Sequence, residues 1–274
     1  MRSARTAILS RATALAAGLT LLIAGCGSSG DDGATSPPSS DGSAGSATEP
    51  APSGDGTSAG DGTTDGGDAT AEGCPAVGAD ASEVPPDATP VATVDLDGDG
   101  QDDELWLSDA DGRTLGVATA AGGVFATTFE AAAPQAATAI AGRLGDGSAI
   151  VLLNTGRSVS LYAVQDCALV PTQNDEGEQY TFDLGFTGFG TGVGCVDLGD
   201  GLALVGLNAV SDDDGATFEV TRTGILLEAM GTSASNGESE VVAEGATADD
   251  PAVTSAQSVS CGEPQEEAVE PGGA

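Results

Sequence analysis

The chain has 274 residues, of which 43 are acidic and 7 are basic, so its formal net charge is −36. All the basic residues are arginines, and the chain contains neither Lys nor His. This composition excludes His-dependent hydrolytic triads, lysine bases and His-ligated metal centres. Nucleic acid and anionic surfaces repel so acidic a chain, so we expect no nucleic-acid partner.

Residues 1–25 have the pattern of an export signal. Three arginines precede the apolar run ATALAAGLTLLIA at residues 12–24, which as a helix rises only about 20 Å and is too short to span a bilayer comfortably. The run ends in IAGC (Ile23–Cys26), which resembles the lipobox of bacterial lipoprotein signal peptides. The resemblance implies cleavage before Cys26 and attachment of membrane lipid to that residue. We therefore expect a protein anchored by lipid at the extracytoplasmic face of the cell membrane; an ordinary cleaved signal with a chance Cys is the alternative.

Residues 26–73 are predicted to be a disordered tether. After Cys26 they are almost entirely Gly, Ser, Asp, Ala, Thr and Pro, with no aromatic residue and no Leu, Ile or Val. Such a segment cannot bury enough apolar surface to offset its chain entropy. The polar stretch PQEEAVEPGGA at residues 264–274 is predicted to be a second disordered end. The folded domain is therefore expected to cover residues 74–263.

Four cysteines remain in the folded region, namely Cys74, Cys167, Cys195 and Cys261. An exported chain lies where disulfides persist, and four cysteines allow three pairings. We expect two disulfides and favour Cys74–Cys261 with Cys167–Cys195, because the first bond would join the two ends of the domain. The spacing of these cysteines is not that of a zinc site.

Short apolar runs rich in Val and Thr alternate with Gly and Asp turns across residues 74–263, which predicts an all-β domain. Three segments share a Leu, an Asp-Gly turn, an apolar strand, a polar turn and a second strand. Their first leucines are Leu96, Leu144 and Leu198, which recur about every 50 residues. This period predicts a propeller-like array of about three to four blades, which need not close into a ring. A β-sandwich is the alternative.

The first repeat contains the stretch TVDLDGDGQDDELWL, in which six carboxylates lie between residues 95 and 104. Four of them stand at positions 1, 3, 5 and 9 of the pattern D-x-D-x-D-G-x-x-D and are Asp95, Asp97, Asp99 and Asp103. Gly100 occupies the position at which such a loop turns sharply. Alternating carboxylates around one turn provide the oxygen ligands that calcium prefers, and the ion removes their mutual repulsion. Asp102 and Glu104 fall outside this set and are expected to point into solvent.

The loop departs from an EF-hand because position 12 is Trp106, where an EF-hand has Glu, and the residues that follow alternate like a strand. It resembles instead the loop of FG-GAP (or VCBS) repeats, which occur in integrin-type propellers and in many exported bacterial proteins. The resemblance implies a Ca²⁺ site formed by Asp95, Asp97, Asp99, the backbone carbonyl of Gln101, and Asp103. The second repeat retains only Asp146 of these acids and the third retains Asp197 and Asp200, so their turns are expected to bind no metal. A solvated acidic turn that binds nothing is the alternative for the first.

Together these features predict a non-catalytic module that acts in adhesion, ligand binding or envelope scaffolding. We expect a monomer whose partner is an unknown protein or cell-wall ligand, and we expect no enzymatic activity. Carboxylate catalysis, as in glycosidases, is the chemical alternative that the composition allows, although few aromatic residues are present to stack on sugars. An accessory subunit of a membrane sensor or transport complex is a third hypothesis.

Overall fold

The computed structural model describes residues 73–76, 82–110, 112–131, 135–185, 191–211 and 214–272. The predicted signal peptide, Cys26 and nearly all of the predicted tether lie outside the described residues. All the described residues belong to one compact unit, Thr64–Ala274. Within this part of the chain, no helix has both the length and the apolar character that a membrane span requires.

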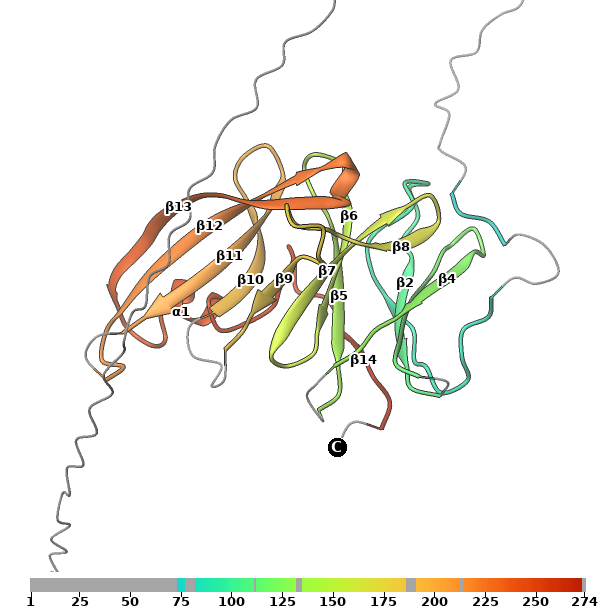
Figure 1. Ribbon diagram of the computed structural model, residues 1–274, viewed down its shortest axis with the longest axis horizontal. Coiled ribbons are helices and arrows are strands. Elements are labelled where there is room, and N and C mark those ends of the chain that lie inside the picture. The colour runs from blue at the N-terminus through green and yellow to red at the C-terminus, as the bar shows by residue number, and fades with distance from the viewer. Residues whose placement is uncertain are drawn as a thin grey trace, which may run out of the picture. The chain divides into compact units, whose positions relative to one another are not determined.

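The first sheet, which we call the N-terminal sheet, is an antiparallel meander of four strands (Figure 1). Its strands are β1 (Val91–Ala92), β2 (Glu104–Ser108), β3 (Thr114–Ala118) and β4 (Val124–Thr128). Successive side chains of a strand point to opposite faces. Leu105 and Leu107 of β2 therefore join the core on one face, while Trp106, only 2% exposed, lies on the other.

The second sheet, the central sheet, is antiparallel and apolar on both faces. Its main path runs β14-β5-β6-β7-β8, and β9 also pairs with β7. The strands are β5 (Thr138–Arg143), β6 (Ala149–Asn154), β7 (Ser158–Gln165), β8 (Ala168–Pro171), β9 (Thr181–Asp183) and β14 (Ala268–Val269). In β6, Val151 and Leu153 belong to one core cluster, whereas Ile150 and Leu152 belong to another. A nearly continuous apolar run such as AIVLLN is therefore typical of a strand buried on both faces.

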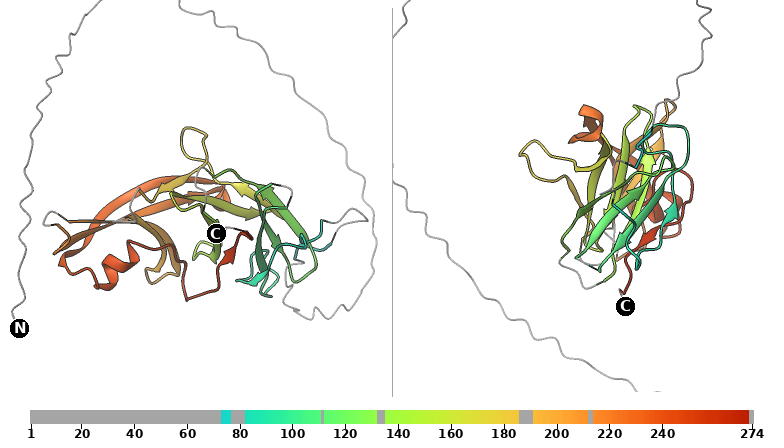
Figure 2. Two further views of the ribbon diagram at one scale, coloured as in Figure 1. Left: turned by 90° about the horizontal axis from the view of Figure 1, so that it is seen from below. Right: turned by 90° about the vertical axis from the view of Figure 1, so that its right-hand side faces the viewer.

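The third sheet, the C-terminal sheet, is a four-stranded antiparallel meander with longer strands. It consists of β10 (Thr191–Asp197), β11 (Leu202–Val210), β12 (Phe218–Glu228) and β13 (Ser233–Ala246). A short 3₁₀ turn, η1 (Ala229–Gly231), joins β12 to β13. The short helix α1 (Pro251–Ser255) lies against one face of this sheet (Figure 2). Its Val253 belongs to a core cluster with residues of β11 and β12.

Two core clusters join the three sheets. One combines residues of the N-terminal and central sheets, and the other combines residues of the central and C-terminal sheets, with Leu161 on the second of these interfaces. The fold is all-β, as the sequence predicts, and its three antiparallel sheets have four, six and four strands in chain order. Over the residues that the structure describes, none of the sheets closes on itself.

The predicted disulfide pairing is wrong. The bonds are Cys74–Cys167 and Cys195–Cys261, with sequence separations of 93 and 66 residues. After α1, the chain returns along β10, where the N–H of Cys195 donates to the carbonyl of Ser260 at 3.1 Å. That return places Cys261 beside Cys195, so the two ends of the domain are joined through the sheets and not by a direct bond between them.

The prediction of a disordered end at residues 264–274 is also wrong for residues 264–272. Strand β14 pairs with β5, and Ala268 is fully buried. Glu270 is 7% exposed; it forms an ion pair with Arg113 and accepts a hydrogen bond from the N–H of Ala137 at 3.0 Å. A polar sequence can be ordered when its charges find partners across the fold, and here the partner is 157 residues away in the chain.

Candidate metal centre

The acidic loop, which we define as residues 95–103, follows β1 and leads into β2. Its base is closed by a hydrogen bond from the N–H of Thr93 to the carbonyl of Asp103, at 2.8 Å. Gly98 and Gly100 have φ angles of 86° and 85°, which residues with side chains rarely adopt. These two glycines turn the chain back on itself and direct the alternating aspartates toward one another.

Three of the predicted ligands are brought together. Carboxylate oxygens of Asp95, Asp97 and Asp99 lie within 4.8 Å of one another, and each of these residues is partly buried. Among the described residues, they form the one group of three or more candidate metal-ligating side chains. The spacing of the first three acids therefore correctly predicts a cluster that can hold a metal ion.

Backbone N–H groups hold the three carboxylates in place. The two oxygens of Asp95 accept hydrogen bonds from the N–H groups of Gly98 (2.6 Å) and Gly100 (3.0 Å). Asp97 Oδ1 accepts from the N–H of Asp99 at 3.2 Å, and Asp99 Oδ1 accepts from the N–H of Gln101 at 2.7 Å. An ionised carboxylate offers about four lone-pair sites, so these bonds orient the oxygens and leave acceptor capacity for a cation.

The start of the described domain contacts this cluster directly. The N–H of Cys74 donates to Asp97 Oδ2 at 2.6 Å. A Cβ atom added to Gly73 would lie 2.7 Å from an oxygen of Asp97 and 2.7 Å from an oxygen of Asp99, so only glycine fits without displacing the carboxylates. The acidic loop therefore contacts residues 73 and 74, where the predicted tether meets the domain.

Asp103, a predicted ligand, has a different position. It is 1% exposed, and its two carboxylate oxygens accept hydrogen bonds from the N–H groups of Leu96 (2.8 Å) and Ala120 (3.0 Å). Burial raises the pKa of the Asp103 carboxyl, an effect that these two N–H donors partly offset. The structure does not place it in the group formed by Asp95, Asp97 and Asp99. Asp103 instead ties the loop to the turn between β3 and β4.

One predicted ligand remains, Gln101, and the acids that were expected to bind no metal lie outside the cluster. Gln101 is exposed, and its side-chain amide donates to Asp99 Oδ2 at 3.2 Å. Asp102 and Glu104 are exposed, as expected. Asp146, from the second repeat, accepts a hydrogen bond from the N–H of Ser148 at 2.9 Å, within its own turn.

One cation lies beside the cluster and was not singled out by the sequence. Arg143, at the end of β5, donates to the carbonyl of Asp95 at 2.9 Å, and its guanidinium lies 3.8 Å from Asp95 Oδ1. The contacts of Arg143, Gly73 and Cys74 were likewise missed, because they come from segments far from the loop in sequence. The one sequence signal that could have pointed to Arg143 is the scarcity of basic residues, because each arginine has many acidic residues as possible partners.

The donor set suits a hard cation. Three carboxylates supply oxygen ligands only, and calcium binds six to eight oxygens in irregular geometry. A divalent ion would add positive charge to that of Arg143, which lies 3.8 Å from Asp95 at the edge of the cluster. Comparison of the chain with protein families, with curated proteins and with solved structures finds no match.

Proposed function

We propose that this protein is a lipid-anchored extracytoplasmic module in which a calcium ion stabilises an all-β domain that acts by binding, without catalysis. The observation that carries the proposal is the contact between the acidic loop and residues 73 and 74, where the tether would join the domain. A domain held on a tether is pulled at that junction. An ion among Asp95, Asp97 and Asp99 would hold the loop against Cys74.

Saturating calcium is expected to raise the melting temperature of the domain. At a free concentration of 100 times Kd, a ligand that binds only the folded state adds about 2.7 kcal/mol to the free energy of unfolding. For a domain of this size, that corresponds to an increase of about 5–10 °C. Scanning calorimetry in calcium and in EDTA measures the shift, and superimposable melts in the two conditions would contradict the metal assignment.

Two variants of the same loop separate a metal site from bulk charge. Asp97→Asn removes one of the clustered carboxylates but keeps an oxygen that can accept from Cys74, so most of the calcium shift is expected to disappear. Asp102→Asn removes the same charge from an exposed position in the same loop and is expected to keep the shift. Equal losses in both variants would mean that calcium acts only through the net negative charge.

Lipid attachment is expected to depend on Cys26 alone. In cells labelled with a radioactive fatty acid, the wild-type chain should incorporate label, because the resemblance of IAGC to a lipobox implies acylation at Cys26. Cys26→Ala should abolish incorporation, while the neighbouring change Ser28→Ala should not. Label retained after Cys26→Ala, or lost after Ser28→Ala, would rule out this anchor.

A further inference from the structure

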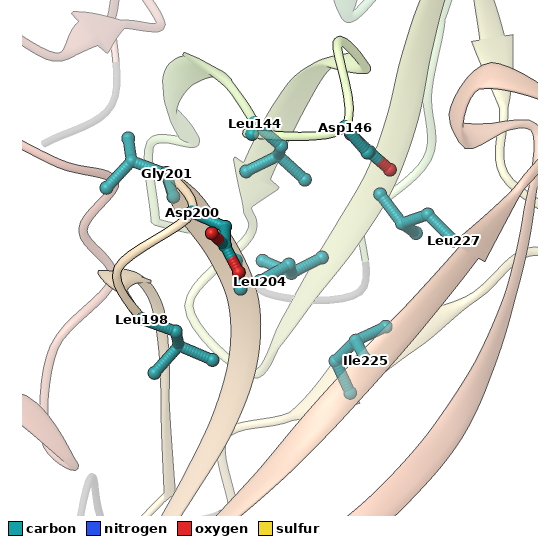
Figure 3. A pocket seen from close by; sticks show the side chains of 11 residues that line it. Leu144, Asp146, Leu198, Asp200, Gly201, Leu204, Ile225 and Leu227 are labelled. Atoms are coloured by element: carbon teal, nitrogen blue, oxygen red, sulfur yellow. The ribbon is translucent and has the colours of Figure 1, made fainter.

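A cavity of about 430 Å³ lies between the C-terminal sheet and the turn that joins β5 to β6 (Figure 3). The aliphatic part of its wall is formed by Leu144 from the turn, Leu202 and Leu204 from β11, and Ile225 and Leu227 from β12, and polar groups of the neighbouring turns form much of the rest. All five belong to the core cluster between the central and C-terminal sheets or pack against it. The cavity therefore lies at one end of that core cluster, where the protein's own side chains leave space unfilled.

The turn between β5 and β6 and the turn between β10 and β11 meet at the edge of the cavity through their backbones. The N–H of Gly145 donates to the carbonyl of Leu202 at 2.8 Å. A Cβ atom on Gly201 would lie 2.7 Å from the Cα of Gly145, so a side chain at Gly201 would force the turns apart. The cavity is shaped by packed strands and a backbone hydrogen bond, which makes it preformed, as sites for small molecules usually are.

The charged groups of the cavity are all negative. Among the described residues that line it, the charged side chains are Asp146 and Asp200, and these come from the two opposing turns (Figure 3). The bond from the N–H of Ser148 holds Asp146 in its turn. Leu198, which also lines the cavity, is 56% exposed, so its apolar side chain is accessible to a ligand at the mouth of the cavity.

We infer that this cavity binds a small amphiphilic cation, whose aliphatic chain fills the leucine-lined space and whose ammonium group lies against Asp146 and Asp200. The volume falls within the range of about 300–1,000 Å³ found for small-molecule sites. A lining without aromatic rings suits an alkyl chain, and two carboxylates without a basic residue beside them in that lining suit a cation. The site shares no residue with the acidic loop and does not depend on the proposed calcium ion.

The probes are n-octylammonium, n-octanol and n-octanoate, which share one alkyl chain and differ in charge. Titration calorimetry uses the full chain with the single change Cys26→Ala, so that no detergent competes for the cavity. Octylammonium is expected to bind about tenfold more tightly than octanol, since each carboxylate adds a modest electrostatic attraction. Octanoate is expected to bind more weakly than octanol. Equal affinities for the three probes, or no binding of octylammonium, would overturn the inference.

Matched charge variants locate the site. Asp146→Asn with Asp200→Asn should reduce the affinity for octylammonium to that for octanol and leave octanol binding unchanged. Glu219→Gln with Glu238→Gln removes the same charge from exposed positions on the same sheet, outside the cavity, and should keep the tenfold preference. If the Glu219→Gln, Glu238→Gln variant lost the preference for octylammonium over octanol, the overall charge of the chain would explain the binding. The same conclusion would follow if the Asp146→Asn, Asp200→Asn variant kept that preference.

A second pair of variants tests the apolar part of the cavity. Leu198→Ser should weaken both octylammonium and octanol by about fivefold, because it removes apolar surface that the ligand covers. Leu226→Ser, at a similarly exposed leucine outside the cavity, should leave both affinities unchanged. Both positions are exposed, so neither change is expected to unfold the chain.

Methyl NMR shifts on binding should concentrate at Leu204 and Ile225, and shifts confined to other methyl groups would contradict the assignment.

Discussion

Replacing Cys74 and Cys167 together with Ala is expected to lower the free energy of unfolding by about 4–5 kcal/mol, the value that loop entropy implies for a ring of this length. The bond spans 93 residues of sequence. It also holds the segment in which the carbonyl of Cys74 accepts from the N–H of Gly123 at 2.9 Å and from the hydroxyl of Thr119 at 2.5 Å, while its N–H contacts Asp97. Urea denaturation under non-reducing conditions measures the loss, and the calcium-dependent stabilisation should become smaller as well.

The other disulfide is a matched control. Cys195→Ala with Cys261→Ala opens a ring of 66 residues, for which the same entropy argument gives a loss within about 0.5 kcal/mol of the first. This bond does not contact the acidic loop, so its removal should leave the calcium shift intact. Two results would contradict this account: a loss below about 1 kcal/mol for the first pair, or peptide mapping that finds Cys74 joined to Cys261.

Trp106→Ala is expected to cost about 3–5 kcal/mol, as is usual for truncating a large buried aromatic side chain. Trp106 of β2 pairs with Gly116 of β3, and a Cβ atom at 116 would lie 2.0 Å from the indole ring. Gly116→Ala alone should therefore cost about 1–3 kcal/mol or more, because the ring has to move. The free energies come from chemical denaturation monitored by far-UV circular dichroism, since the single Trp is itself changed.

The two changes together should be less damaging than their sum. With the ring removed, the methyl group that Gly116→Ala adds enters vacated space, so we expect a coupling of more than about 1 kcal/mol in a double-mutant cycle. The indole N–H also lacks a hydrogen-bond partner among the described residues. Trp106→Phe removes this unsatisfied donor and should cost much less than Trp106→Ala. Additive effects of the first two changes would mean that Trp106 does not lie over Gly116.

Much of the acidic loop was predictable because its geometry depends on neighbouring residues. Asp95, Asp97 and Asp99 alternate along a short turn, and the glycines at 98 and 100 permit the positive φ angles that bring their carboxylates together. No distant segment is required for that arrangement. Asp103 belongs to the same sequence pattern, yet its carboxylate binds the N–H of Ala120, a residue of the turn between β3 and β4. The motif therefore predicts three of its four carboxylates as a cluster and misplaces the fourth.

The cavity was less predictable, although several of its residues belong to the repeated pattern of the sequence. The sequence aligned Leu144 with Leu198 and singled out Asp146 and Asp200 as remnants of the repeated turn. Nothing in the spacing shows that the second and third turns face each other. That contact depends on the packing of the central sheet against the C-terminal sheet, where the backbones of Gly145 and Gly201 approach closely.

The all-β class, the repeated hairpins and the clustered aspartates could be predicted from the amino-acid sequence, since they follow from alternation of side chains and from turn residues close together in the chain. The pairing of the cysteines, the contact between Glu270 and Arg113, and the space between two sheets depend on the folded arrangement. A local pattern selects a backbone conformation, whereas contacts between distant segments depend on how the sheets pack to bury apolar surface. Three disulfide pairings have similar chain entropy, and the packing of the sheets selects one of them.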